Sequence, residues 1–119
     1  MKKVIVLRNR ISGKVIFEYA KENNTIKETV KEAVRRGMDL DYADLSGADL
    51  SGADISFVSF KGADLSGANL SGASLLFSNF QSANLSGADL SGADLRNAKY
   101  GGADLSGTNL SGAKYYLRG

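Results

Sequence analysis

Apolar residues return every five positions along most of the chain. Set in fives from Met38, residues 38–117 give sixteen consecutive copies without an insertion. The third position is always a large apolar or aromatic residue, the first is alanine in twelve copies, and the fifth is glycine in ten. A period of five fits neither the helix period of about 3.6 nor the strand period of about 2. The backbone is therefore expected to turn once in every repeat.

The fifth position is expected to form the turn. Glycine accepts the positive φ that a tight corner requires, and the Asp, Asn and Ser residues common at positions two and four can hydrogen-bond to nearby backbone. If positions one and three point inward, small and large side chains alternate along a narrow core. The aromatic substitutions give the size of one coil, because they recur at intervals of twenty: Phe60, Phe80 and Tyr100, and also Phe57 and Phe77.

Four repeats therefore make one coil, and neighbouring coils are expected about 4.8 Å apart. The four predicted coils are 38–57, 58–77, 78–97 and 98–117. This repeat, Ala-Asp/Asn-Leu-x-x over 80 of the 119 residues, resembles that of the pentapeptide-repeat proteins. The resemblance implies an all-β solenoid, namely a right-handed quadrilateral β-helix of four coils.

Residues 1–37 follow another pattern and are expected to cap the repeat domain, residues 38–117. Short apolar runs in KVIVL (3–7) and KVIFEY (14–19) flank the turn-forming residues RNRISG, which predicts two strands joined as an antiparallel β-hairpin. An α-helix should follow, with one apolar face. That face comprises Ile26, Val30, Ala33 and Val34.

The ends of this helix are also marked in the sequence. Thr25 and Glu28 fit a capping box at its N-terminus, and Gly37 fits a C-terminal stop. Since the first repeat begins at Met38, hairpin and helix should plug the N-terminal opening of the coil stack.

The composition argues against an enzyme. The chain has no His and no Cys, so the commonest general base and the best neutral-pH nucleophile are both missing. A narrow core filled by Ala and Leu leaves no room for a substrate, and the many fourth-position serines are expected to hold turns. Calcium is not expected either, because only Asp44 and Asp64 place like charges on adjacent coils. We expect no cofactor and no metal.

Charge is divided between the two parts of the chain. Residues 1–37 carry ten Lys and Arg against four Glu, and residues 38–119 carry five against nine Asp. Nucleic-acid binding by the basic cap is not favoured, since an ordinary solvated surface explains these charges. The apolar run near the start of the chain is too short to span a membrane. The absence of cysteine suits a cytoplasmic protein.

Some pentapeptide-repeat proteins bind bacterial DNA gyrase by presenting a DNA-like acidic rod. The resemblance therefore implies, as an alternative function, a DNA-mimicking inhibitor or modulator of gyrase. B-DNA carries one negative charge per about 1.7 Å of axis, which is far denser than nine Asp on a rod of roughly 20 Å. Our preferred hypothesis is a non-catalytic structural or protein-interaction scaffold, whose protein partner the sequence does not identify. The regularity of the repeats also allows an engineered consensus protein.

Two surfaces are candidates for binding. Phe57, Leu76 and Phe77 should form an exposed apolar patch along one corner, which is expected to dock the hairpin or otherwise to bind a partner or a second subunit. Two arrangements are open for the C-terminal coil. Either its tyrosines cover the end of the core in a monomer, or the C-terminal coils of two chains meet around a twofold axis in a homodimer. The residues expected in that dimer are Tyr100, Leu105, Leu110, Tyr115 and Tyr116.

Overall fold

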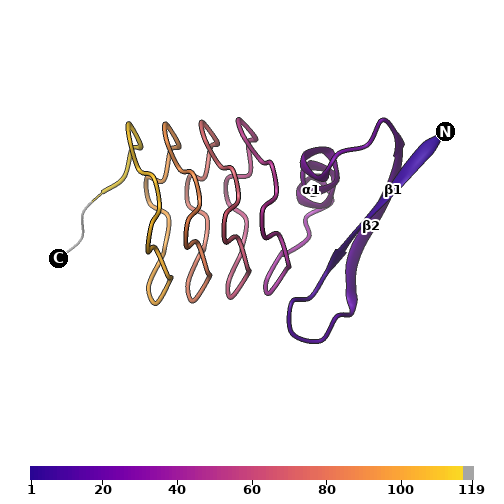
Figure 1. Cartoon of the computed structure of the whole chain (residues 1–119), viewed down its shortest axis with the longest axis horizontal. Coiled ribbons are helices and arrows are strands. Elements are labelled where there is room, and N and C mark those ends of the chain that lie inside the picture. The colour runs from indigo at the N-terminus through magenta and orange to yellow at the C-terminus, as the bar shows by residue number, and fades with distance from the viewer. Residues whose placement is uncertain (117–119) are drawn as a thin grey trace.

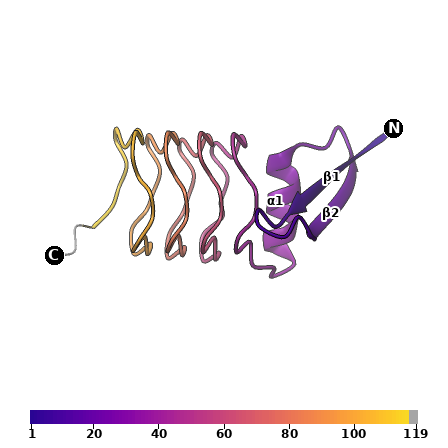
Figure 2. The ribbon, with the colours of Figure 1, turned by 60° about the horizontal axis from the view of Figure 1, so that its bottom comes forward.

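The computed structural model describes residues 1–116, in which a small N-terminal cap precedes a stack of coils (Figure 1). The cap contains strands β1 (Lys2–Arg8) and β2 (Val15–Glu22) and helix α1 (Ile26–Arg35). Helix α1 lies between the hairpin and the first coil (Figures 1 and 2). Leu117, the last residue of the predicted repeat domain, lies outside the described residues.

The predicted hairpin is present, with strands slightly longer than the sequence pattern indicated. The strands pair antiparallel with Leu7 opposite Phe17, and the register shifts between Leu7 and Arg8. Leu7 and Phe17 are buried and belong to the same apolar cluster as the coil residues. The hairpin and the coils therefore share one core.

The N-terminus of α1 carries half of the predicted capping box. The Thr25 hydroxyl accepts a hydrogen bond from the Glu28 backbone N–H at 3.1 Å. The Glu28 carboxylate does not return to Thr25; it accepts a hydrogen bond from the Lys21 ammonium at 3.2 Å instead. An ammonium group on the neighbouring strand is a stronger partner for a carboxylate than a backbone amide. That part of the prediction was therefore wrong.

The C-terminus of α1 ends as predicted. Gly37 has φ 73° and donates its N–H to the Val34 carbonyl at 2.9 Å, and Met38 donates to the Ala33 carbonyl at 3.0 Å. These two bonds form a Schellman motif, which satisfies carbonyls that the helix leaves unpaired. The first repeat follows immediately.

The coils stack with the predicted period of twenty. Parallel bridges join residues twenty apart throughout the stack, for example Asp44 with Asp64 and Asn84 with Asp104. The backbone hydrogen bonds follow one rule: Leu45 donates to the Asp64 carbonyl at 2.8 Å, and Asp64 donates to the Ala43 carbonyl at 2.9 Å. Each repeat thus bonds to the coils on both sides, and the coils are visible as evenly spaced loops in Figure 1.

Every described residue at the fifth position has positive φ, which confirms the predicted corner. Five of these residues are not glycine, and they adopt the same backbone conformation. They are Tyr42, Phe57, Phe77, Ser82 and Asn97. The side chain at position two supports the corner: Asp64 Oδ1 accepts hydrogen bonds from both the N–H and the hydroxyl of Ser66, at 3.0 and 2.6 Å.

Large side chains fill the interior of the coils. The third-position residues are buried from Leu40 to Leu95. The rings of Phe60 and Phe80 stack inside the coils with centroids 5.2 Å apart and planes 3° from parallel. At the N-terminal opening, Val30 of α1 is fully buried and belongs to the same cluster as Leu40, so the helix covers the opening.

The hairpin turn is bonded to the edge of the first coil. Asn9 bridges antiparallel to Ala43; Arg10 donates its N–H to the Tyr42 carbonyl at 2.7 Å, and Asp44 donates to the Arg8 carbonyl at 2.8 Å. The coil edge, which would otherwise expose unpaired backbone groups, is therefore occupied on this side.

A valine at Gly67 tests the corner. Gly67 has φ +66°, and a Cβ added there would meet nothing within 4 Å, so the cost should come from the backbone alone. The left-handed conformation costs an L-residue roughly 1–2 kcal/mol, and β-branched residues resist it most. We expect Gly67→Val to lower the free energy of unfolding in urea by about 2 kcal/mol. Gly67→Asn should lower the free energy of unfolding clearly less, because asparagine tolerates this conformation. Equal losses below about 0.5 kcal/mol would contradict the predicted corner.

Candidate interaction surfaces

The polar residues of the repeats are occupied by structural hydrogen bonds. Six fourth-position serine hydroxyls bond to the second-position side chain of the same repeat, as Ser51 does to Asp49 at 2.7 Å and Ser71 to Asn69 at 2.7 Å. Within residues 1–116, no group of three or more His, Cys, Asp or Glu side chains could hold a metal ion. In the same range, no helix is long and apolar enough to cross a membrane.

These turns hold the aspartates in the ionised form. The hydroxyl and the N–H of Ser51 donate to Asp49 and lower the pKa of its carboxyl. The hydroxyl and the N–H of Ser106 lower the pKa of Asp104 in the same way. Hydrogen bonds to a carboxylate favour its charged form, so the corners that contain Asp are more stable when this Asp is ionised.

This dependence predicts a loss of stability in acid. Because the folded-state pKa values are lowered, the stabilisation is present above the unfolded-state pKa and is lost as pH falls through the folded-state values. Asn makes the same turn at Asn69 without titrating. The free energy of unfolding measured in urea should therefore fall as the pH drops below about 5, and it should fall less steeply for the double variant Asp49→Asn, Asp104→Asn. Identical pH profiles would contradict this role of the carboxylates.

Phe57 and Phe77 form an exposed aromatic stack on one corner. Their ring centroids lie 5.1 Å apart with planes 7° from parallel, while Phe57 is 74% and Phe77 53% exposed. Leu76 is half-buried next to Phe77 in the chain. The structure thus brings the three predicted residues to one corner, and their part in binding stays a prediction.

The hairpin does not cover this patch, so the expectation that it docks there was wrong. It pairs with the backbone of Tyr42 and Asp44, and the Arg10 guanidinium donates to the Gly62 carbonyl at 3.1 Å. Backbone pairing at the edge of the first coil fixes the hairpin at that edge. The patch lies on a different corner and stays open to solvent.

The aromatic residues of the patch occupy an unfavourable backbone conformation. Phe57 has φ 63° and Phe77 φ 58°, at the position where ten repeats have glycine. Such a φ costs an L-residue roughly 1–2 kcal/mol, whereas an aromatic pair contributes about 0.5–1.5 kcal/mol. Folding alone therefore gains little from two phenylalanines here, which makes this corner a candidate binding surface.

The C-terminal coil forms a second candidate surface. Its third-position side chains surround an apolar cavity of about 280 Å³, which we call the cup. The cup is lined by Phe80, Leu85, Leu90, Leu95, Tyr100, Leu105, Leu110 and Tyr115. Leu105 is 36% and Tyr115 42% exposed. Four of the five predicted dimer residues therefore meet at one site.

The fifth predicted residue, Tyr116, lies beside the cup. Its carbonyl accepts a hydrogen bond from the Tyr100 hydroxyl at 3.1 Å. It lines a neighbouring surface hollow together with Lys99, Gln81 and Phe77. The sequence analysis missed this hollow, although Lys at a position usually taken by Asp, Asn or Ser was a signal for it.

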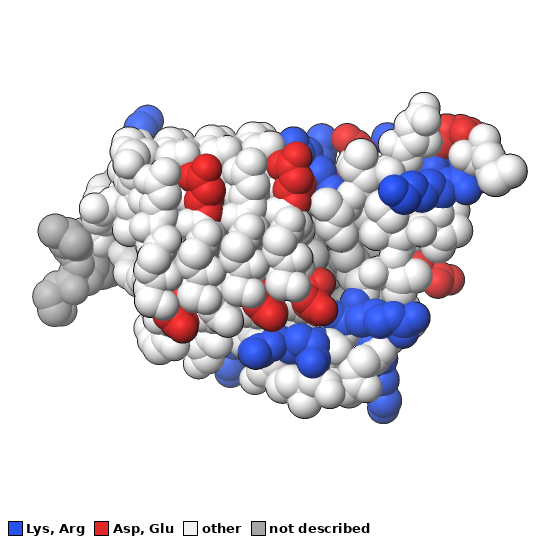
Figure 3. Space-filling view, in the orientation of Figure 1, with Lys and Arg blue, Asp and Glu red and all other residues white. Residues whose placement is uncertain are grey.

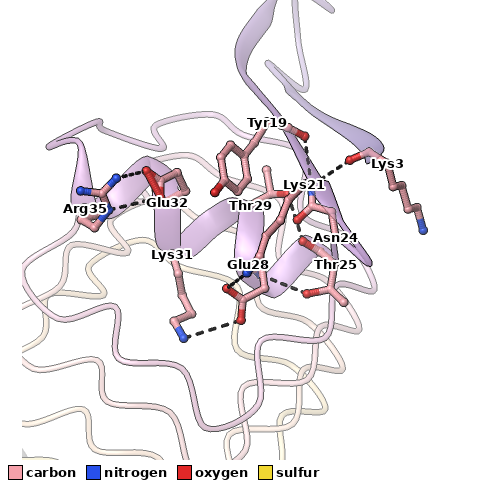
Figure 4. A network of polar contacts seen from close by, with 10 residues as sticks. All are labelled: Lys3, Tyr19, Lys21, Asn24, Thr25, Glu28, Thr29, Lys31, Glu32 and Arg35. Atoms are coloured by element: carbon pink, nitrogen blue, oxygen red, sulfur yellow. Dashed lines mark hydrogen bonds and ion pairs between the residues drawn. The ribbon is translucent and has the colours of Figure 1, made fainter. Parts of the chain in front are cut away.

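Several basic residues of the cap are engaged in local contacts, among them Lys21, Lys31 and Arg35 (Figure 4). Glu28 binds Lys21 at 3.2 Å and Lys31 at 3.8 Å, and the hydrogen bond from Lys21 lowers the pKa of its carboxyl. Glu32 forms ion pairs with Arg35 and Arg36. In Figure 3, charges of both signs lie around the cap, and uncharged side chains separate the acidic residues of the coils.

Comparisons with known proteins agree with the repeat pattern. The family model for pentapeptide repeats matches residues 36–67, 59–97 and 88–114, with eight copies. No curated protein sequence matches the chain at a significant level.

Solved structures of similar proteins include a pentapeptide repeat protein from the thylakoid lumen of Arabidopsis thaliana. It is 39% identical with a TM-score of 0.65, and the match covers 69% of this chain and 57% of that one. The chain thus spans little more than half the length of that relative. HetL of the cyanobacterium Nostoc, a pentapeptide repeat protein involved in heterocyst differentiation regulation, is 39% identical over 63% of this chain and 39% of that one, with a TM-score of 0.38.

QnrB1, a plasmid-mediated fluoroquinolone resistance protein, is more distant. It is 24% identical over 61% of this chain and 57% of that one, with a TM-score of 0.18. A similarity at this level is too low to indicate a shared function.

Proposed function

Because the chain belongs to the pentapeptide-repeat family, we propose that it is a non-catalytic scaffold, a right-handed four-sided β-helix that presents a binding surface to another protein. The stacked pair of Phe57 and Phe77 is the observation that supports this function best. Both rings are more than half exposed on a hydrogen-bonded coil corner. Aromatic side chains on a rigid support bind partners at low entropic cost.

The side-chain chemistry supports a role without catalysis. The chain has no His or Cys, and several serine hydroxyls of the repeats serve the turns, as Ser66 does with Asp64. A nucleophilic serine needs an adjacent base, and a carboxylate that holds the turn is committed to that bond. Presenting a surface requires neither group.

Removal of the aromatic pair tests the proposal. We expect the double variant Phe57→Gly, Phe77→Gly to fold, because glycine suits the positive φ at both positions. Affinity-purified wild type and variant would be compared by quantitative mass spectrometry of proteins captured from a lysate of the source organism. Ser82→Gly is the matched control, since it makes the same change at a corner residue with φ 60°.

The proposal would be supported if wild type and Ser82→Gly capture the same protein and the double variant captures at least tenfold less of it. Equal capture by all three proteins would overturn it.

Gyrase modulation is the alternative function. Asp94 is paired with Arg96 at 2.7 Å, and Asn or Ser separates most other Asp residues along the columns. This pattern is less dense than the charge of DNA. We expect no inhibition in a supercoiling assay at micromolar protein, and inhibition there would favour the alternative.

A homodimer through the C-terminal coil also remains a proposal. The exposure of Leu105 and Tyr115 supports it, because burying these apolar side chains against a second chain would remove them from water and stabilise the contact. Light scattering measures the mass, and Leu110→Lys or Tyr115→Glu tests the location. A dimer that survives both changes would place the contact elsewhere.

A further inference from the structure

The patch of Phe57, Leu76 and Phe77 lies on a corner whose two sides carry opposite charges. Asp54 comes three residues before Phe57, on the side of the coil that leads into the corner, and Lys61 comes four residues after it, on the side that leads out. Both side chains are exposed, and neither forms an ion pair with another described residue. An unpaired acid and an unpaired base therefore flank the patch.

The Asp54 carboxylate is available because the serine of its repeat bonds elsewhere. In several repeats the serine hydroxyl bonds to the side chain two residues before it, as Ser51 does to Asp49 at 2.7 Å. The hydroxyls of Ser56 and Ser74, on adjacent coils, bond to each other instead, at 2.8 Å. The Ser56 N–H donates to Asp54 over 3.4 Å, which is long for a hydrogen bond. Asp54 thus keeps most of its accepting capacity for another partner.

The two stacked rings form one apolar ridge, and the charges flank it at the level of Phe57. The polar and apolar residues on either side of Phe77 are uncharged: Ser74, Leu76, Asn79 and Gln81. Two coils after Phe57, Asp94 precedes and Lys99 follows the corner with the same signs, although Arg96 already binds Asp94 at 2.7 Å. The side before the corner is therefore acidic where the side after it is basic.

We propose that this patch binds a second copy of the chain, with the two coil stacks side by side and parallel around a twofold axis along their length. In this arrangement the side before the corner of one copy faces the side after the corner of the other, at the same level. Asp54 of each copy lies opposite Lys61 of the partner copy, and the aromatic ridges meet between the two ion pairs. The inference rests on the proposed function, since it names the partner of the same surface.

The charges favour the parallel pairing over an antiparallel one. An antiparallel pair would bring like sides together: with the Phe77 rings at its centre, Lys61 would face Lys99 of the partner copy. Parallel pairing instead brings opposite charges together at the level of Phe57. Exposed ion pairs add little affinity, so burial of the rings holds the contact and the charges fix its orientation. A contact along one corner is small, and we expect self-association to depend strongly on concentration.

Charge reversal followed by mixing tests this pairing on the full chain. Asp54→Lys alone places a cation opposite Lys61 of the partner copy, and Lys61→Asp alone places an anion opposite Asp54. Because like charges across an interface are costly, each variant should self-associate at least about tenfold more weakly than wild type. An equimolar mixture of the two variants restores both opposite-charge contacts, so it should associate as wild type does. Sedimentation equilibrium at up to about 1 mM protein measures all four samples.

Three further variants serve as controls. Asp49→Lys makes the same change at an exposed second-position aspartate on another side of the coil and should leave self-association unchanged. Leu110→Lys, at the C-terminal coil, should also leave it unchanged. The double variant Phe57→Gly, Phe77→Gly removes the ridge and should abolish it. Circular dichroism checks that each variant folds.

Three results would overturn the proposal: wild type that is monomeric at about 1 mM, a mixture that associates no better than the single variants, or equal effects of Asp54→Lys and Asp49→Lys. Its failure can be told from failure of the proposed function. If wild type is monomeric but captures a different protein from the lysate through Phe57 and Phe77, this inference fails and the proposed function stands.

Discussion

Replacing Phe60 by alanine is expected to lower the free energy of unfolding by about 3–5 kcal/mol. Phe60 is fully buried, and its ring stacks on that of Phe80 inside the coils. The void cannot close by a sideways shift, since coil hydrogen bonds hold the backbone on both sides, such as that from Phe60 to Asn79 at 2.7 Å. The lost packing and the lost ring contact should therefore lower the free energy of unfolding by almost their full value.

Phe57 provides the matched control for this measurement. It is the same residue type three positions earlier, and it also stacks on a phenylalanine one coil away, but it is 74% exposed. Phe57→Gly removes the ring and relieves the positive φ, two effects of opposite sign and about 1 kcal/mol each. We expect a net change within about 1 kcal/mol. Urea unfolding of both variants gives the comparison, and a loss below about 1 kcal/mol for Phe60→Ala would contradict the proposed packing.

Leu85→Ala is expected to cost about 2–5 kcal/mol. Leu85 lies in the column that also contains Leu65 and Leu105, and it is only 2% exposed. Its side chain is covered by the coils before and after it, so truncation leaves a cavity between two layers. The same argument applies to Leu65, which is fully buried.

Leu105→Ala tests whether position in the stack, rather than residue type, sets this cost. Leu105 occupies the same column one coil later but is 36% exposed. Its truncation removes contacts on one side only and lets water enter, so we expect a loss of roughly 1 kcal/mol. Denaturation should be followed at a concentration where light scattering finds a monomer. Similar losses for Leu85→Ala and Leu105→Ala would show that the column is not layered as described.

The sequence predicted the repeat domain closely because the repeat period leaves few alternatives. Aromatic residues twenty apart, such as Phe60 and Phe80, indicated which residues lie on adjacent coils, and the bridges have this spacing. Positive φ at position five could be predicted even for Phe57, since its neighbours in the repeat pattern are glycines. Strict periodicity converts a local pattern into long-range contacts.

The cap and the terminal site were harder to predict because their contacts are not periodic. The position of the hairpin depends on backbone pairing between Asn9 and Ala43, for which the side chains give no signal. The partner of Glu28 is Lys21, which comes close only after β2 and α1 pack together. The hollow at Lys99 depends on where Tyr100 and Tyr116 lie at the end of the stack.

The constant spacing of the bridges has a consequence for how the protein folds. Each coil closes a loop of the same twenty residues onto its predecessor, so the entropy lost per coil does not grow as the stack lengthens. Folding can then advance one coil at a time from the cap, where α1 and the hairpin already provide a covered surface. Amide hydrogen exchange should therefore be slowest in the coils next to the cap, and should speed up toward Leu110, where each opening breaks contacts with one neighbour only.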